Sequence, residues 1–317
     1  MNPFWGTNFF TFFQVLFSRL FTWNYSVITA DEIQIGTLSC IAICCGLIGP
    51  FLVLKKMTMF ANSLSHTILL GIVISFLLLG GVVLSDFSHL FVGALIAAIF
   101  TAILTEGLVK WFGLAEDASV GLVFTVLFAA GIVLSTLFLK DVHLGIESVI
   151  GNADVLQLAD LRNAAILVLL NSLAIVLFFR QFRLSSFDSN LAKVLGIPEG
   201  VFRFSLLFLV SVTCMGAFRA VGVLLVLAFL VGPFLTARLF CHRLKQLLFY
   251  SCIVGIAASF CGVAFARHIL SEYDLALSTG GIVVCLIGLF YFLGLIIKAC
   301  LRRQSMILSI LKMESHD

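Results

Sequence analysis

The sequence predicts an all-α fold, a polytopic bundle of about nine transmembrane helices (eight to ten), from its composition and from the length of its apolar stretches. Of the 317 residues, 62% are hydrophobic and only 11% are charged, whereas soluble domains carry about 25% charged residues. A water-soluble fold of this composition would expose large apolar patches. A helix needs about 20 apolar residues to cross the hydrocarbon core. Nine stretches approach or reach that length: 33–54, 61–80, 88–110, 118–139, 161–180, 201–217, 220–240, 246–267 and 276–298.

The two ends of the chain differ from this central part. Residues 9–23 are apolar, but the stretch is short and contains Arg19, so we expect an interfacial helix rather than a span. The start of the chain has neither the early basic cluster nor the cleavage site of a signal peptide, so we expect the first span to serve as the insertion signal. The chain then divides into an N-terminal interfacial segment (1–32), a transmembrane domain (33–298) and a cytoplasmic tail (299–317).

The basic residues predict the orientation in the membrane, because Lys and Arg concentrate in cytoplasmic loops. When Lys55 and Lys56 are placed inside and the spans alternate from there, 14 of the 19 Lys and Arg residues fall inside and 5 fall outside. We therefore expect the N-terminus outside, the C-terminus inside and an odd number of spans.

The sequence offers no machinery for an enzyme. It contains no GxxxxGK[ST] phosphate cradle, no HExxH and no GxSxG motif. Any ATP-driven work must therefore use a second chain as the ATPase. The net charge of +3 is too small to indicate nucleic acid as a partner.

The nine cysteines lie almost entirely inside apolar runs, and no CxxC pair occurs. Cys40 and Cys44 are four residues apart and could share a helix face as soft metal ligands. Small hydrophobic packing residues are the simpler interpretation. We expect no fixed structural metal site and no cofactor bound by this chain.

The second predicted span carries a polar stripe. If its helix starts near Met57, His66 lies roughly 14 Å along it, close to the midplane of the bilayer. Asn62 is one turn earlier on the same face, and Ser65 lies beside them. One interpretation is a hydrophilic path on which neutral imidazole meets a passing transition metal. The other is a hydrogen bond from His66 to a neighbouring helix that holds the bundle together.

Other charged and kinked positions favour simpler roles. Glu106 lies near the inner end of its span with Lys110 four residues on, which indicates a surface ion pair. The turn at 216–219, which contains Arg219, looks tight and suggests that the sixth span is short, broken or re-entrant. Gly222 and Pro233 follow in the next span, where proline removes a helix hydrogen bond and serves gating or packing.

The internal loop 181–200 contains a candidate amphipathic helix. Phe187, Leu191 and Leu195 recur at four-residue spacing, while Asp188 and Lys193 are polar. Asp188 falls in the first turn, where a negative charge suits the helix dipole.

Four segments, in order, resemble the permease subunits of metal-importing ATP-binding-cassette (ABC) transporters, which serve zinc, manganese and iron. They are GLIGPFLVLKKMTMFANSLSHTILLG (46–71), EDASVGLVFTVLFAAGIVL (116–134), FDSNLAKVLGIPEG (187–200) and FRAVGVLLVLAFLVGPFLTARLF (218–240). The chain departs from the family where Ala61, Asn62 and Ser63 stand in place of Gly-Asp-Ala. The histidine of that motif, His66, is present.

The resemblance implies a permease of the bacterial cytoplasmic (inner) membrane, working as two permeases, either two copies or two related chains. Two cytoplasmic ATPases that use ATP and an extracytoplasmic metal-binding protein would complete the assembly. A metal would pass His66, Asn62 and Ser65 transiently, and the helix near 187–197 would dock on the ATPase. The residues of that coupling helix are Phe187, Asp188, Leu191, Ala192, Leu195, Gly196 and Ile197.

Three other functions compete with this one. A secondary transporter or metal exporter would need no ATPase, but such proteins often show inverted repeats and intramembrane carboxylates. The sequence shows no clear internal repeat and almost no acidic residue in mid-span. An intramembrane enzyme using His66 lacks a partner motif. A structural scaffold would leave the Asn62–His66 stripe and the amphipathic helix without a role.

Overall fold

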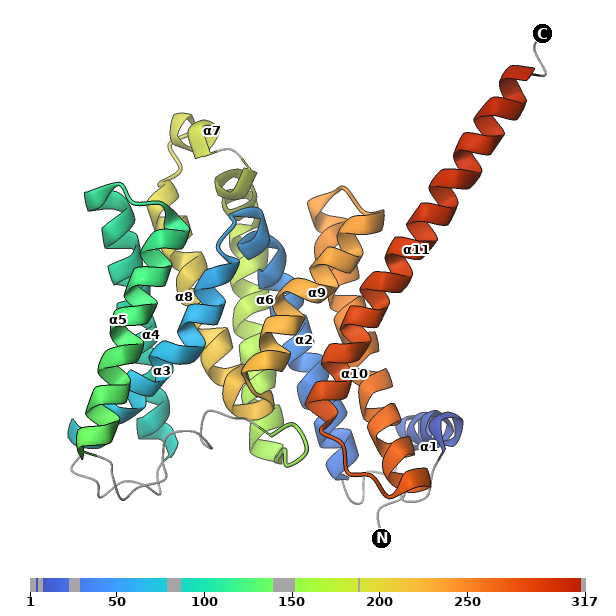
Figure 1. Ribbon diagram of the computed structural model, residues 1–317, viewed down its shortest axis with the longest axis horizontal. Helices are drawn as coiled ribbons and strands as arrows, with labels where there is room; N and C mark the ends of the chain where they lie inside the picture. Colours follow the sequence, from blue (N-terminus) through green and yellow to red (C-terminus); the bar gives the residue numbers. More distant parts are fainter. Residues whose placement is uncertain are drawn as a thin grey trace.

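The computed structural model describes residues 4, 8–22, 29–78, 87–138, 152–187 and 189–314, and all regular secondary structure among them is helical. The helices are α1 (Phe9–Thr22), α2 (Ala30–Leu54), α3 (Thr58–Leu78), α4 (Phe87–Phe112), α5 (Glu116–Phe138), α6 (Leu158–Phe187), α7 (Ser189–Val194), α8 (Glu199–Val221), α9 (Val223–Phe240), α10 (Leu244–Tyr273) and α11 (Thr279–Glu314). The long helices run side by side, and α7 lies at the same end of the bundle as the C-terminus (Figure 1). We call this end the inner end, following the orientation that the basic residues predict.

The prediction of an all-α membrane bundle is confirmed. Within the described residues, eight helices are long and apolar enough to cross a membrane: α2, α4, α5, α6, α8, α9, α10 and α11. Helix α3 has 21 residues, which is also a spanning length. These nine helices correspond one by one to the nine predicted stretches.

Helix α1 packs beside the spans but is too short to be one of them. Its 14 residues cover about 21 Å, less than the roughly 30 Å of the hydrocarbon core. Figure 1 shows it nearly end-on beside the outer end of α10. Phe9 packs edge-on against Phe265 of α10, with 5.9 Å between the ring centroids, and Arg19 pairs with Glu32 of α2 at 2.8 Å. This arrangement suits the interfacial helix that the sequence predicts.

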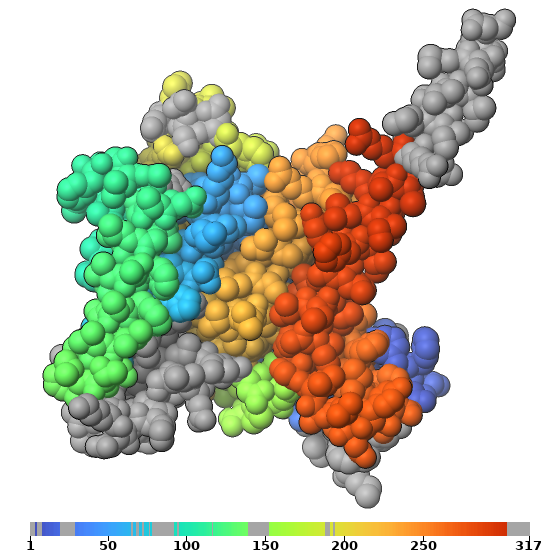
Figure 2. All heavy atoms as spheres, viewed as in Figure 1, coloured from blue at the N-terminus to red at the C-terminus, as the bar shows by residue number. Residues whose placement is uncertain are grey.

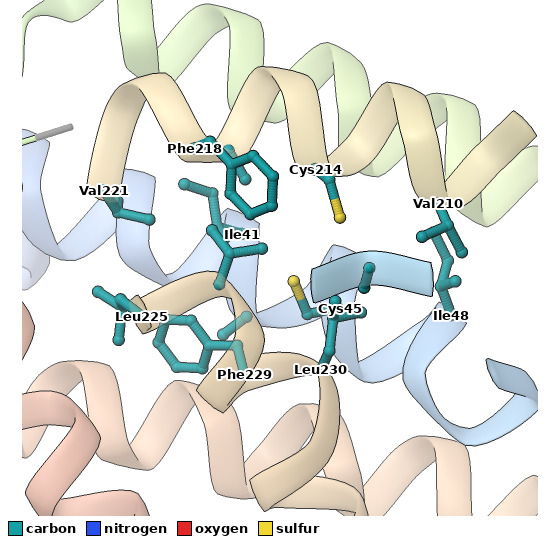
Figure 3. Close-up of a cluster of buried hydrophobic side chains, with 14 of the residues drawn as sticks. Ile41, Cys45, Ile48, Val210, Cys214, Phe218, Val221, Leu225, Phe229 and Leu230 are labelled. Carbon is teal, nitrogen blue, oxygen red and sulfur yellow. The ribbon is translucent and has the colours of Figure 1, made fainter. Parts of the chain in front are cut away.

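Helix α2 is the centre of the main packing group, where it contacts α6, α8, α9 and α10. Figure 3 shows Ile41, Cys45 and Ile48 of α2 facing Cys214 and Phe218 of α8 and the side chains of α9. All are buried. Gly49 allows α9 to approach closely, because a Cβ at this position would collide with the carbonyl oxygen of Leu230. Small residues at such contacts are typical of helix packing in membranes.

A second packing group consists of α3, α4 and α5, which contact one another extensively and meet the rest of the bundle mainly through α8. In Figure 1 these three helices form one side of the molecule, with α8 between them and α6. Figure 2 shows α3 at the surface of the viewed face, between α5 and α9. Helix α8 therefore joins the two packing groups.

The prediction of a short or broken sixth span is wrong. Helix α8 has 23 residues and continues through the expected turn at 216–219. The chain turns instead at Gly222, whose φ of 86° is a backbone conformation that residues with a side chain rarely adopt. Helix α9 then continues through Pro233 without interruption.

Candidate functional site

The imidazole of His66 lies between α3 and α5. Its centroid is 5.0 Å from the ring of Phe124 and 5.1 Å from the ring of Phe128, both on α5. The side chain is half-buried. Counted from Thr58, His66 lies about 12 Å along α3, well inside a span of about 30 Å. The structure thus keeps this polar ring at membrane depth and partly open.

The inner part of this side of α3 is open. Asn62, one turn from His66, is exposed, and Met59 is 58% exposed. The three residues share a face because they are three and four positions apart. Towards the outer end α5 crosses closely over α3, where a Cβ on Gly131 would lie 3.1 Å from the backbone nitrogen of Leu70. The side chain of Ser65 lies outside the described part of the structure, and the role of all three predicted path residues stays a prediction.

The predicted coupling helix is split between two elements. Phe187 is the last residue of α6. Two residues earlier, Ser185 accepts a hydrogen bond from the ammonium group of Lys55 at 2.8 Å, which ties this end of α6 to the end of α2. Asp188 lies outside the described residues, and α7 comprises only Ser189–Val194. The described residues thus assign Phe187 to α6 and Leu191 and Ala192 to α7, and the role of this segment as a coupling helix stays a prediction.

The apolar residues of this segment remain at the surface. Phe187 is 62% exposed, Leu191 44% and Leu195 52%, while Ala192 is fully buried. The backbone N–H of Ile197 donates to the carbonyl of Ala192 at 2.9 Å, and Gly196 has a φ of 72°. This compact turn carries the chain directly from α7 into α8 and presents apolar side chains at the inner end.

Glu106 is not the surface residue that the sequence suggests. It pairs with Lys110 at 3.0 Å, as predicted, but it is 7% exposed and also pairs with Arg203 of α8 at 2.9 Å. The prediction missed Arg203 because this partner comes from another helix far along the chain. A cavity of about 660 Å³ separates this cluster from the turn after α7 and is lined by Glu106, Lys110, Gly196, Ile197, Pro198, Glu199, Gly200 and Arg203.

A second polar region, at the outer end, has no counterpart in the sequence-based predictions. Arg267 of α10 forms an ion pair with Asp31 of α2, whose side chain is 5% exposed. Asp154 accepts hydrogen bonds from the side chain of Gln34 and from the backbone N–H of Thr279, both at 3.2 Å. These five residues line a cavity of about 850 Å³ that opens between α2, α10 and the start of α11.

Two of the predicted kink residues, Arg219 and Gly222, lie at the junction of α8 and α9, and the third, Pro233, lies within α9. Arg219, in the last turn of α8, is 3.9 Å from Asp160 of α6. Gly222 provides the break between the helices, and Pro233 lies buried inside α9. Their role in gating stays a prediction.

Within the described part of the chain, no three His, Cys, Asp or Glu side chains lie close enough together to hold a metal ion. Cys44 is buried, and Cys40 is half-buried. Their burial in an apolar helix favours the packing interpretation of this pair.

Comparison with known proteins places this arrangement in a family. Residues 33–298 match the ABC 3 transport family. The chain is 40% identical to a probable metal transport system membrane protein of Chlamydia muridarum, over 98% of each chain. It is 35% identical to the manganese transport system membrane protein MntD of Bacillus subtilis, over 81% of this chain and 88% of that one.

A solved structure shows the same architecture. PsaBC from Streptococcus pneumoniae, in complex with Fab, aligns with a TM-score of 0.68 and 26% identity over 84% of this chain and 91% of that chain. Together with the apolar spans, these relatives identify a multi-pass protein of the inner membrane. The chain belongs to the ABC 3 transport family.

Proposed function

We propose that this chain is the permease subunit of an ABC importer that moves a divalent transition metal (manganese, zinc or iron) across the bacterial cytoplasmic membrane. The metal is the substrate, and a separate cytoplasmic ATPase supplies the energy. The relatives are membrane components of metal transport systems. The role of the chain is therefore transport, with ATP hydrolysed by its partner.

The observation that carries the ATPase partner is the exposed apolar segment at the inner end. Phe187 at the end of α6, Leu191 in α7 and Leu195 in the turn after it each keep roughly half of their surface exposed. Exposing apolar side chains to water beyond the end of a span is unfavourable, so contact with the surface of another protein would stabilise this segment. A cleft on the ATPase fits this requirement.

The open face of α3 supports a second permease as a partner, either another copy or a related chain. Asn62 is exposed about 6 Å along α3, a helix of spanning length, and polar side chains inside a membrane favour protein or water-filled surroundings. A second permease covering this face would enclose the Asn62–His66 stripe between the two subunits, and a second copy of this chain would add its own stripe to the same path.

The outer cavity supports an extracytoplasmic metal-binding protein as the third partner. Asp31, Asp154 and Arg267 provide both signs of charge around it. Charges of both signs orient a docking partner and speed its association, and they contribute less to the affinity of the complex.

The test is to express the tagged chain together with the ABC ATPase of a metal transport system from the same organism. We expect the two to co-purify in equal amounts from detergent-solubilised membranes. An ATPase that binds a sugar importer of the same organism serves as the control and should not be retained. Recovery of the chain without either ATPase would contradict the proposed function and favour a secondary transporter.

A further inference from the structure

The segment 187–197, which we call the coupling segment, and the region around His66 belong to different parts of the bundle. His66 is on α3, within the group formed by α3, α4 and α5. The coupling segment leads into α8, which is the main contact between this group and the helices around α2 (Figure 1). A movement of α7 that follows the chain into α8 can pass from there to α4 or α3, both of which contact α8, and so reach the helix that carries His66.

The path from α7 to α8 is short and stiff. Ala192 is fully buried, and the carbonyl of the same residue accepts a hydrogen bond from Ile197. Pro198, with a φ of −72°, directly precedes the first residue of α8. A displacement of α7 by a docked ATPase would thus be passed to the first turns of α8, which include Arg203.

Arg203 connects this end of α8 to α4. Its Nε lies 2.9 Å from Oε2 of Glu106, and the two side chains are 15% and 10% exposed. Lys110 is 3.0 Å from the other oxygen of the same carboxylate but is 56% exposed. An ion pair with little water around it is screened less than one at the surface. Of the two contacts that Glu106 makes, the one with Arg203 is the more buried, and it joins α4 to α8.

The cavity beside the pair gives the segment room to move. About 660 Å³ of open space lies between Glu106, Arg203 and the turn formed by residues 196–200. Packed interfaces change between discrete arrangements rather than deforming continuously, so an empty volume next to a buried ion pair is where such a change is least obstructed.

We propose that Glu106 is a positioning residue that transmits the movement of the coupling segment, through Arg203, to the α3–α4–α5 group and its His66. The inference rests on the proposed function, because it assumes an ATPase at α7. It assigns to the pair a role in coupling beyond that of holding α4 against α8.

The test measures metal transported per ATP hydrolysed in proteoliposomes that contain the complete permease–ATPase complex. For Glu106→Gln we expect the complex to form and to hydrolyse ATP within about twofold of the wild-type rate, with metal transported per ATP reduced roughly tenfold. The matched control is Glu32→Gln, which removes a similarly short and partly buried ion pair with Arg19 at the outer end. Its ratio of metal to ATP should equal that of the wild type.

Removing one charge of a buried pair leaves the other uncompensated, which destabilises the fold. The double variant Glu106→Gln/Arg203→Gln avoids this penalty and should show the same loss of coupling. A wild-type ratio in either variant would overturn the inference, as would a parallel fall of ATP hydrolysis and transport. An absence of ATP-driven uptake in the wild-type complex would instead contradict the proposed function.

Discussion

Replacing His66 with alanine is expected to reduce metal uptake roughly 10- to 100-fold, while the chain still inserts and binds its ATPase. Changes in the surroundings of a metal ligand already cost about this factor in affinity, and loss of a ligand costs at least as much. The imidazole is half-buried against two phenylalanine rings, so its removal leaves an apolar gap on the proposed path. Uptake of radioactive manganese or zinc by cells that express the variant measures the effect.

Two further substitutions separate a metal ligand from a structural hydrogen bond. His66→Gln retains hydrogen-bonding ability but loses most metal affinity, so full uptake in this variant would mean that His66 only supports packing. Asn62→Asp should change metal preference or affinity if the stripe faces the path. Thr67→Val is the control on the same helix, because the Thr67 hydroxyl is buried and already donates to the carbonyl of Leu64 at 3.2 Å. Uptake should stay near normal in that variant.

Replacing Leu191 with aspartate should abolish co-purification of the ATPase and, with it, transport. The side chain is 44% exposed on α7, and a partner that buries it would have to bury a carboxylate instead, at a cost of several kcal/mol. A loss of about 4 kcal/mol is roughly a thousandfold in affinity. The measurement is the amount of ATPase retained by the tagged chain after solubilisation.

Leu191→Met is the matched control, since it conserves volume and apolar character and should bind normally. The aspartate variant should still reach the membrane in normal amount because position 191 lies outside the spans. If the Leu191→Asp variant retains the ATPase normally, α7 is not part of the surface on which the ATPase docks.

The helices could be predicted from the sequence because their signal is local. A run of about 20 apolar residues has only one stable structure in a bilayer, and each of the nine stretches became a long helix. The end of α8 was harder to place. Gly216 is flexible in isolation, yet the packing of α8 keeps it helical, and the turn forms at Gly222.

The candidate site could be predicted only in part. The spacing of Asn62 and His66 placed them on one face of a helix, because this depends on the helix period alone. Arg203 beside Glu106, and Asp31 beside Arg267, join helices that are distant in the sequence. No local sequence pattern indicates such pairs, so both polar clusters could be identified only in the folded structure.

The most direct test of the central claim is metal accumulation by proteoliposomes that contain the purified chain, with and without its ATPase. We expect accumulation only when the ATPase and ATP are both present on the side that carries α7, with no response to a proton or sodium gradient. Accumulation driven by an ion gradient in proteoliposomes that contain the chain alone would contradict the assignment and identify a secondary transporter.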